Sequence, residues 1–142
     1  MNTGHWTTAG RIYIFVNVKL YMKFSEDLAA VHAYLCSDGM VKQFGKHYQI
    51  KFTNITPELL NDFNVRFFRE FNIKPKEYWE EHICKLLVFN KNLFFELMKF
   101  GPYDSRNWET PLKFLKKDTI KMKFLETLVL CRRELAKRPL IL

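Results

Sequence analysis

The chain has 142 residues, of which 48% are hydrophobic and 27% charged, and its formal net charge is +8. This length fits one domain with a real core and is too short for two ordinary domains, and the apolar content excludes an intrinsically disordered chain. The positive charge favours a polyanionic partner without establishing nucleic-acid binding. Three scattered cysteines, Cys36, Cys84 and Cys131, argue against a disulfide framework and predict an intracellular protein, cytoplasmic or organellar.

The first 24 residues are interpreted as an N-terminal arm before one domain over residues 25–142. Residues 12–18 alternate aliphatic side chains with others, which suits a strand, although a first helical turn also fits. This run is too short to span a membrane and lacks the small-residue cleavage site of a signal peptide. We therefore expect no membrane partner.

A helix of small and apolar residues is predicted over residues 26–37, with Ser25 as its N-cap and Gly39 as its end. It places the carboxylate of Asp38 at one helix end. Small residues recur every fourth position and form one stripe along which a second helix backbone can approach closely. These residues are Ala29, Ala33 and Ser37.

A hairpin and a helix are predicted next. Apolar side chains alternate strictly along residues 47–54, which indicates a strand with one solvated face, and residues 45–46 supply the turn that joins it to a strand over 40–44. The Thr-Pro pair at 56–57 starts a helix that ends near Asn72. Its buried stripe is predicted to be Leu59, Phe63, Phe67, Phe68 and Phe71.

The second half of the chain repeats this order. The predicted elements are strands over 76–79 and 83–89, a helix over 91–100, a loop over 102–110, a short helical stretch near 111–117 and a final helix over 118–136. Asn90 is the expected cap of the helix over 91–100. The chain thus alternates helix, hairpin, helix, hairpin, helix.

That order, with Asp-Gly at the end of a small-residue helix, resembles the LAGLIDADG homing endonucleases, including the intein- and intron-encoded types. Motif positions 31–39 read VHAYLCSDG and keep the small packing positions, while residues 47–54 and 86–101 look like the second strand and the fourth strand with its helix. The resemblance covers roughly residues 25–133. It implies an α+β, αββαββα half-domain with a saddle-shaped mixed or antiparallel sheet, helices on one face and an extra C-terminal helix.

A second motif of this family aligns with residues 125–133, where Thr127 and Cys131 take the small positions. The Asp-Gly of that motif is replaced by Arg132-Arg133, and too few residues follow for a second αββαββ unit. The last helix either packs against the motif helix within one chain or leaves residues 26–37 to form a homodimer. The sequence leaves both arrangements open.

The resemblance implies metal-assisted cleavage of a phosphodiester, with Mg²⁺ or another divalent cation held by acids at the ends of two adjacent helices. Asp38 with Gly39 is the implied metal position, and Asp38 and Asn54 are the implied catalytic residues, Asn54 as a group that holds water. Because Arg132 stands where the second acid is needed, a single chain is expected to be inactive. Two copies of Asp38 in a homodimer would restore the pair.

The resemblance also implies double-stranded DNA as the partner, bound on the saddle-shaped face of the sheet. The residues assigned to this face are Lys42, Lys46, His47, Gln49, Lys51, Thr53 and, in the second hairpin, Lys85. The leading hypothesis is a homing-endonuclease-like protein that binds DNA and, as a dimer, cleaves it. The alternatives are a non-catalytic nucleic-acid-binding module of the repressor or maturase kind and a degenerate structural fragment. His32 and Cys36, one helical turn apart, are interpreted as packed side chains rather than zinc ligands.

Overall fold

The structure is a computed structural model that describes residues 5–8, 11–16, 19–22, 24–103, 108 and 115–137, with side chains in 24–103, 108 and 115–133. The main elements are α1 (Glu26–Asp38), β4 (Gly39–Phe44), β5 (His47–Asn54), α2 (Pro57–Phe71), β6 (Lys76–Glu80), β7 (Ile83–Phe89), α3 (Lys91–Met98) and α4 (Asp118–Lys137). Most of the predicted loop over 102–110 and of the helical stretch near 111–117 lies outside the described residues.

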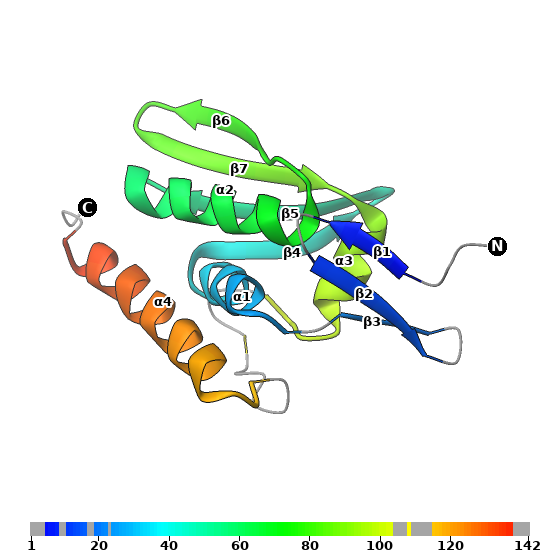
Figure 1. Ribbon diagram of the computed structural model, residues 1–142. Coiled ribbons are helices and arrows are strands. Elements are labelled where there is room, and N and C mark those ends of the chain that lie inside the picture. Colours follow the sequence, from blue (N-terminus) through cyan, green and yellow to red (C-terminus); the bar gives the residue numbers. More distant parts are fainter. Residues whose placement is uncertain are drawn as a thin grey trace.

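Four antiparallel strands form the main sheet, in the order β4-β5-β7-β6. The helices α1, α2 and α3 pack on one face of it, and α4 lies beside α1 (Figure 1). Alternate residues of β5 and β7, such as Ile50, Phe52 and Leu86, point into the core beneath these helices. The predicted α+β class and the αββαββα order are confirmed.

The N-terminal arm contains a separate three-stranded antiparallel sheet. It consists of β1 (His5–Thr8), β2 (Arg11–Val16) and β3 (Lys19–Met22), in that order. Only β2 coincides with the strand predicted over 12–18. Strands β1 and β2 lie beside α2 and do not join the main sheet.

The ends of α1 are set by local chemistry. The Ser25 hydroxyl accepts a hydrogen bond from the Leu28 amide at 3.0 Å, which satisfies one of the unpaired donors of the first turn. At the other end, the Gly39 amide donates to the Leu35 carbonyl. A Cβ at Gly39 would lie 2.4 Å from the Leu35 Cα, so only glycine lets β4 leave the helix this closely.

The core joins α2 to the sheet through aromatic rings. Phe63 and Phe67 are buried, as predicted, together with Leu59 and Phe71. The prediction for Phe68 is wrong, because its side chain is 47% exposed. Neighbouring residues on a helix point about 100° apart, so Phe67 and Phe68 cannot both lie at the centre of one stripe.

Helix α4 packs along the small-residue stripe of α1 within the same chain (Figure 1). Ala29 and Ala33 are fully buried against a cluster that includes Phe124, and Thr127 and Cys131 are buried on α4. The Thr127 hydroxyl donates to the Lys123 carbonyl at 2.8 Å, which satisfies it inside the interface. Of the two arrangements that the sequence left open, the structure has the internal one. The stripe is therefore not an open surface for a homodimer through residues 26–37.

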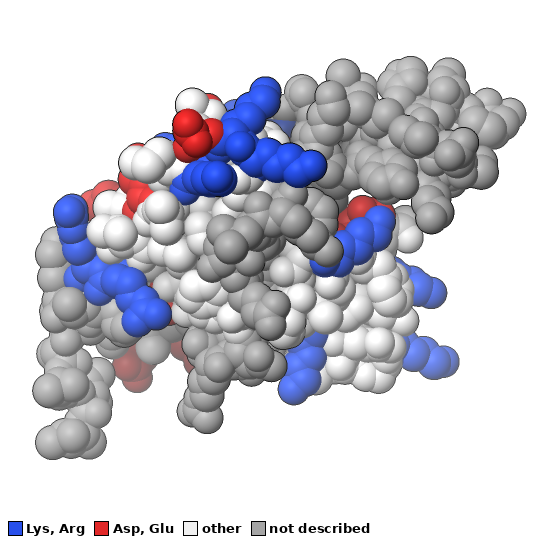
Figure 2. Space-filling model, turned by 90° about the horizontal axis from the view of Figure 1, so that it is seen from below, with Lys and Arg blue, Asp and Glu red and all other residues white. Residues whose placement is uncertain are grey.

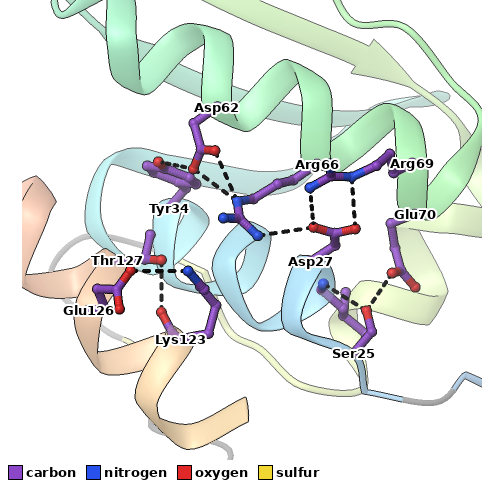
Figure 3. A network of polar contacts seen from close by, with 11 residues as sticks. Ser25, Asp27, Tyr34, Asp62, Arg66, Arg69, Glu70, Lys123, Glu126 and Thr127 are labelled. Atoms are coloured by element: carbon purple, nitrogen blue, oxygen red, sulfur yellow. Dashed lines mark hydrogen bonds and ion pairs between the residues drawn. The ribbon is translucent and has the colours of Figure 1, made fainter. Parts of the chain in front are cut away.

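A network of charged side chains fastens α2 to the start of α1 (Figure 3). The Arg66 guanidinium donates to Asp27 and to Asp62, each at 3.0 Å, and the Tyr34 hydroxyl donates to Asp62 at 2.6 Å. Burial and the Asp62 carboxylate raise the pKa of Tyr34, so the phenol stays protonated. Arg66 is largely buried, and losing either carboxylate would leave its charge without a partner.

Candidate nucleic-acid interface

The face of the main sheet that points away from the helices is named the open face. Strand pairing arranges its side chains in rows across the sheet. The central row consists of Lys76, Leu87, Lys51 and Met40. The row on one side of it consists of Tyr78, Lys85 and Thr53. The row on the other side consists of Phe89, Gln49 and Lys42, and the row beyond that of His47 and Phe44. The open face thus combines lysines and amide or hydroxyl groups with exposed rings.

Most of the residues assigned to this face from the sequence lie on it. Lys42, His47, Gln49, Lys51, Thr53 and Lys85 share it by strand register. Lys46 does not, because it lies in the turn between β4 and β5. Lys76 was not predicted from the sequence, and its pairing with Leu87 places it on the open face.

Lys85 is partly neutralised by its neighbour. Its ammonium donates to the Glu80 carboxylate at 2.8 Å across the β6–β7 hairpin. This hydrogen bond and the charge of Lys85, with a smaller effect of Lys51, lower the pKa of Glu80. Lys42, Lys51 and Lys76 are therefore better placed than Lys85 to contact a phosphate.

Asp38 and Asn54 lie together at the junction of α1 and the sheet, on the side of the helices. The Asn54 amide nitrogen donates to the Asp38 carboxylate at 3.1 Å. The amide oxygen of Asn54 accepts from the backbone amides of Ile55 and Thr56, each at 2.9 Å. Asn54 is buried and faces away from the open face, so it orients Asp38 rather than presenting a water site on the open face.

A divalent cation at Asp38 would need further oxygen ligands. Within the part of the chain that the structure describes, no three His, Cys, Asp or Glu side chains come together as a metal site. Asn54 turns its nitrogen, not its oxygen, toward Asp38. The described residues of one chain therefore do not fit a divalent metal centre for phosphodiester cleavage.

The three cysteines are free, buried thiols. Burial raises the pKa of Cys36 to about 12 and also raises the pKa of Cys84. The thiols of Cys36 and Cys84 therefore stay protonated, and all three cysteines are packed in the core. His32 is likewise buried in a ring cluster, as predicted for a packed helix position.

Basic charge is not confined to the open face. On the face seen from below the view of Figure 1, Lys and Arg side chains are spread over the surface rather than gathered into one patch (Figure 2). Charge that is spread over a surface attracts a polyanion at long range but does not define where the polyanion would bind. No helix among the described residues is long and apolar enough to cross a membrane.

The fold and the open face define an α+β protein with one helix-covered and one solvent-facing side of its sheet. No protein-family model and no curated protein matches the sequence. Among solved structures, the chain is similar to a variant of I-DmoI in complex with its target DNA in the presence of Mn, with 15% identity and a TM-score of 0.47 over 74% of this chain and 61% of that one. It is also similar to mesophilic variants of the homing endonuclease I-DmoI, with 12% identity and a TM-score of 0.43 over 72% and 61% of the two chains. The chain spans less than two thirds of the length of these relatives.

Proposed function

We propose that this protein binds double-stranded DNA on the open face of its sheet. The observation that carries the proposal is the set of lysines on adjacent rows of one solvent-facing sheet face, together with Gln49 and Thr53. Ammonium groups contact phosphates, and a glutamine amide pairs with the edge of adenine in the major groove. A two-stranded antiparallel ribbon, such as β4 with β5, is one of the shapes that the major groove admits.

Binding through these lysines predicts a defined salt dependence. Each lysine that contacts a phosphate releases counterions from the DNA. The double variant Lys42→Gln with Lys51→Gln should therefore bind duplex DNA more weakly. The magnitude of its slope of log affinity against log salt should be smaller by about two. The measurement is fluorescence anisotropy titration of a labelled blunt duplex at several salt concentrations.

The matched control is Lys99→Gln. Lys99 follows α3, on the covered side of the sheet, and is paired with Glu96 at 3.1 Å. This variant should leave both affinity and slope nearly unchanged. The double variant removes two charges and the control one, so equal losses for each charge removed would show that binding depends on overall charge and not on the open face.

DNA cleavage is the second candidate function, and we propose it only for an assembly in which a second chain brings another carboxylate. The observation in its favour is the Asp38 carboxylate at the end of α1, held by Asn54 at 3.1 Å. Against it stand the internal packing of α4 on α1 and Arg132 at the position of the missing acid. The proposal therefore requires either α4 to leave α1 or the second carboxylate to approach by another route.

A cleavage assay with Mg²⁺ on a library of duplex targets tests this second candidate. Any activity should rise with more than the first power of protein concentration and should fall at least about a hundredfold in Asp38→Asn, because a neutral amide cannot replace a metal-binding carboxylate. Glu58→Gln, which removes an exposed carboxylate at the start of α2, is the control. Cleavage that survives Asp38→Asn would remove Asp38 from the mechanism.

A further inference from the structure

Three rings lie side by side at the end of the open face nearest the β4–β5 turn. Phe44 on β4 is paired with His47 on β5, and the centroids of the His47 and Phe89 rings are 6.4 Å apart. Phe44 and Phe89 are 45% and 55% exposed, and His47 is also exposed. We name these three residues the aromatic cluster. Rings that are about half exposed on a sheet still offer ring surface to a flat partner.

Lysines surround the aromatic cluster. The Lys42 ammonium lies 5.2 Å from the centroid of the Phe44 ring. At the end of the sheet beside the cluster, Lys46 lines a hollow of about 490 Å³ with His47 and Phe89. Lys91 lies on the α3 side of this hollow, where its ammonium is 5.6 Å from the centroid of the Tyr48 ring. No acidic side chain belongs to the described lining of this hollow.

Exposed rings flanked by ammonium groups match the chemistry of an unpaired nucleotide. Inside a duplex each base face is already covered by its neighbours, and a protein ring reaches it only by unstacking a base step at a cost of about a few kcal/mol. Unpaired bases offer their faces without that cost. Stacking on aromatic side chains with a cationic surface along the backbone is the usual way proteins hold single strands. We propose that the aromatic cluster stacks unpaired bases of a nucleic acid while Lys42 on the open face and Lys46 in the adjoining turn contact its phosphates.

The inference deepens the proposed function, and it rests on it, because both place nucleic acid on the open face. A second copy of this chain is a poorer occupant. It would bring the same lysines against themselves, and like charges across an interface oppose association. The chain's net charge of +8 acts in the same direction.

Binding of single strands by the double variant Phe44→Ala with Phe89→Ala tests the proposal. Single-stranded DNA and single-stranded RNA of one sequence should each be measured beside the blunt duplex. We expect the affinity of the preferred single strand to fall about five- to a hundredfold, whereas that of the duplex changes less than about twofold. A 2-aminopurine base in the strand should be quenched on binding the native protein and much less on binding the variant.

The control is Phe68→Ala, which removes an equally exposed ring from α2 on the covered side of the sheet. Comparing the affinities for single-stranded RNA and single-stranded DNA shows whether the ligand carries ribose or deoxyribose. A preference for either strand supports the proposal. It is overturned if the double variant weakens duplex and single strand equally or leaves both unchanged. It is also overturned if light scattering shows a native dimer that becomes a monomer in this variant. It is overturned, too, if the double variant loses duplex binding while single-strand stacking stays intact. A native protein that stacks single strands but does not bind the duplex would instead contradict the proposed function.

Discussion

Replacing Phe63 by alanine should lower the free energy of unfolding by about 3–5 kcal/mol, because it opens a cavity where α1, α2 and β5 meet. The Phe63 side chain is 1% exposed. Its ring stacks on Phe52 and Phe67, with centroids 4.6 and 5.3 Å away, and meets the Tyr34 ring edge-on at 5.9 Å. Because the ring touches three others, the surrounding side chains can fill the cavity only if all three of these rings move.

The control for this prediction is Phe68→Ala on the same helix. Phe68 is 47% exposed, so its removal should change the free energy of unfolding by less than about 0.5 kcal/mol. Chemical denaturation followed by circular dichroism gives both values. Similar losses in the two variants would mean that α2 does not bury the face that the structure assigns to it.

The contrast between these two rings shows what the sequence of α2 could and could not predict. Helical spacing identified Leu59, Phe63, Phe67 and Phe71 as a buried stripe, and all are buried. The same spacing argument predicts burial of Phe68, but its position on the helix lies beside the stripe and its side chain is 47% exposed. Leu60 is buried instead. The apolar character of a side chain favours its burial, but its position around the helix determines whether it faces the core.

The strands show a similar division. Strict alternation along residues 47–54 predicted β5 with its bounds and its two faces. In β6 every residue is exposed, so no alternation marks which side chains share the open face. Lys76 can be placed only through its pairing with Leu87, and that partner is distant in the sequence. Strands β1 and β3 were missed because their pairing, too, depends on neighbours rather than on a strong local pattern.

The placement of α4 is the part of the candidate site that sequence alone left undecided. The small residues of α1 and α4 indicated that each helix has a close partner, and they fit an internal pair and a two-chain pair equally well. In the structure, Ala29 and Ala33 are covered by α4 of the same chain. With α4 in this place, a second copy of the chain cannot bring its own Asp38 beside the first through residues 26–37. The change to Arg132 is therefore not the only obstacle to a pair of acids.

Acid should destabilise the protein through His32, whose ring lies in the core. Its Nδ1 is 2.6 Å from the Tyr103 hydroxyl oxygen, and its Nε2 has no hydrogen-bond partner among the described residues. The rings of Phe24, Phe100 and Phe124 also surround it. Burial lowers the pKa of His32 from 6.5 to about 3, because a charged imidazole cannot be solvated there.

The sign of the effect follows from proton binding. Between these two pKa values the unfolded chain holds a proton on His32 and the folded chain does not. The stabilising contribution is complete above pH 6.5 and is lost by about 1.4 kcal/mol for each pH unit below it, on the order of 5 kcal/mol in all. Tyr103 does not oppose this, since burial raises its own pKa and keeps it neutral throughout.

Unfolding free energies measured between pH 6.5 and about 5 isolate this effect, because ordinary carboxylates remain mostly ionised there. His32→Gln keeps a polar group beside Tyr103 but does not titrate, so its stability should be nearly constant across the window. The control His47→Gln removes an exposed histidine of the open face and should retain the slope of the native protein. A native protein whose stability is constant over this range would contradict a neutral, buried His32. If the glutamine variant does not fold, His32→Leu provides the same comparison, since it also leaves nothing to protonate in the core.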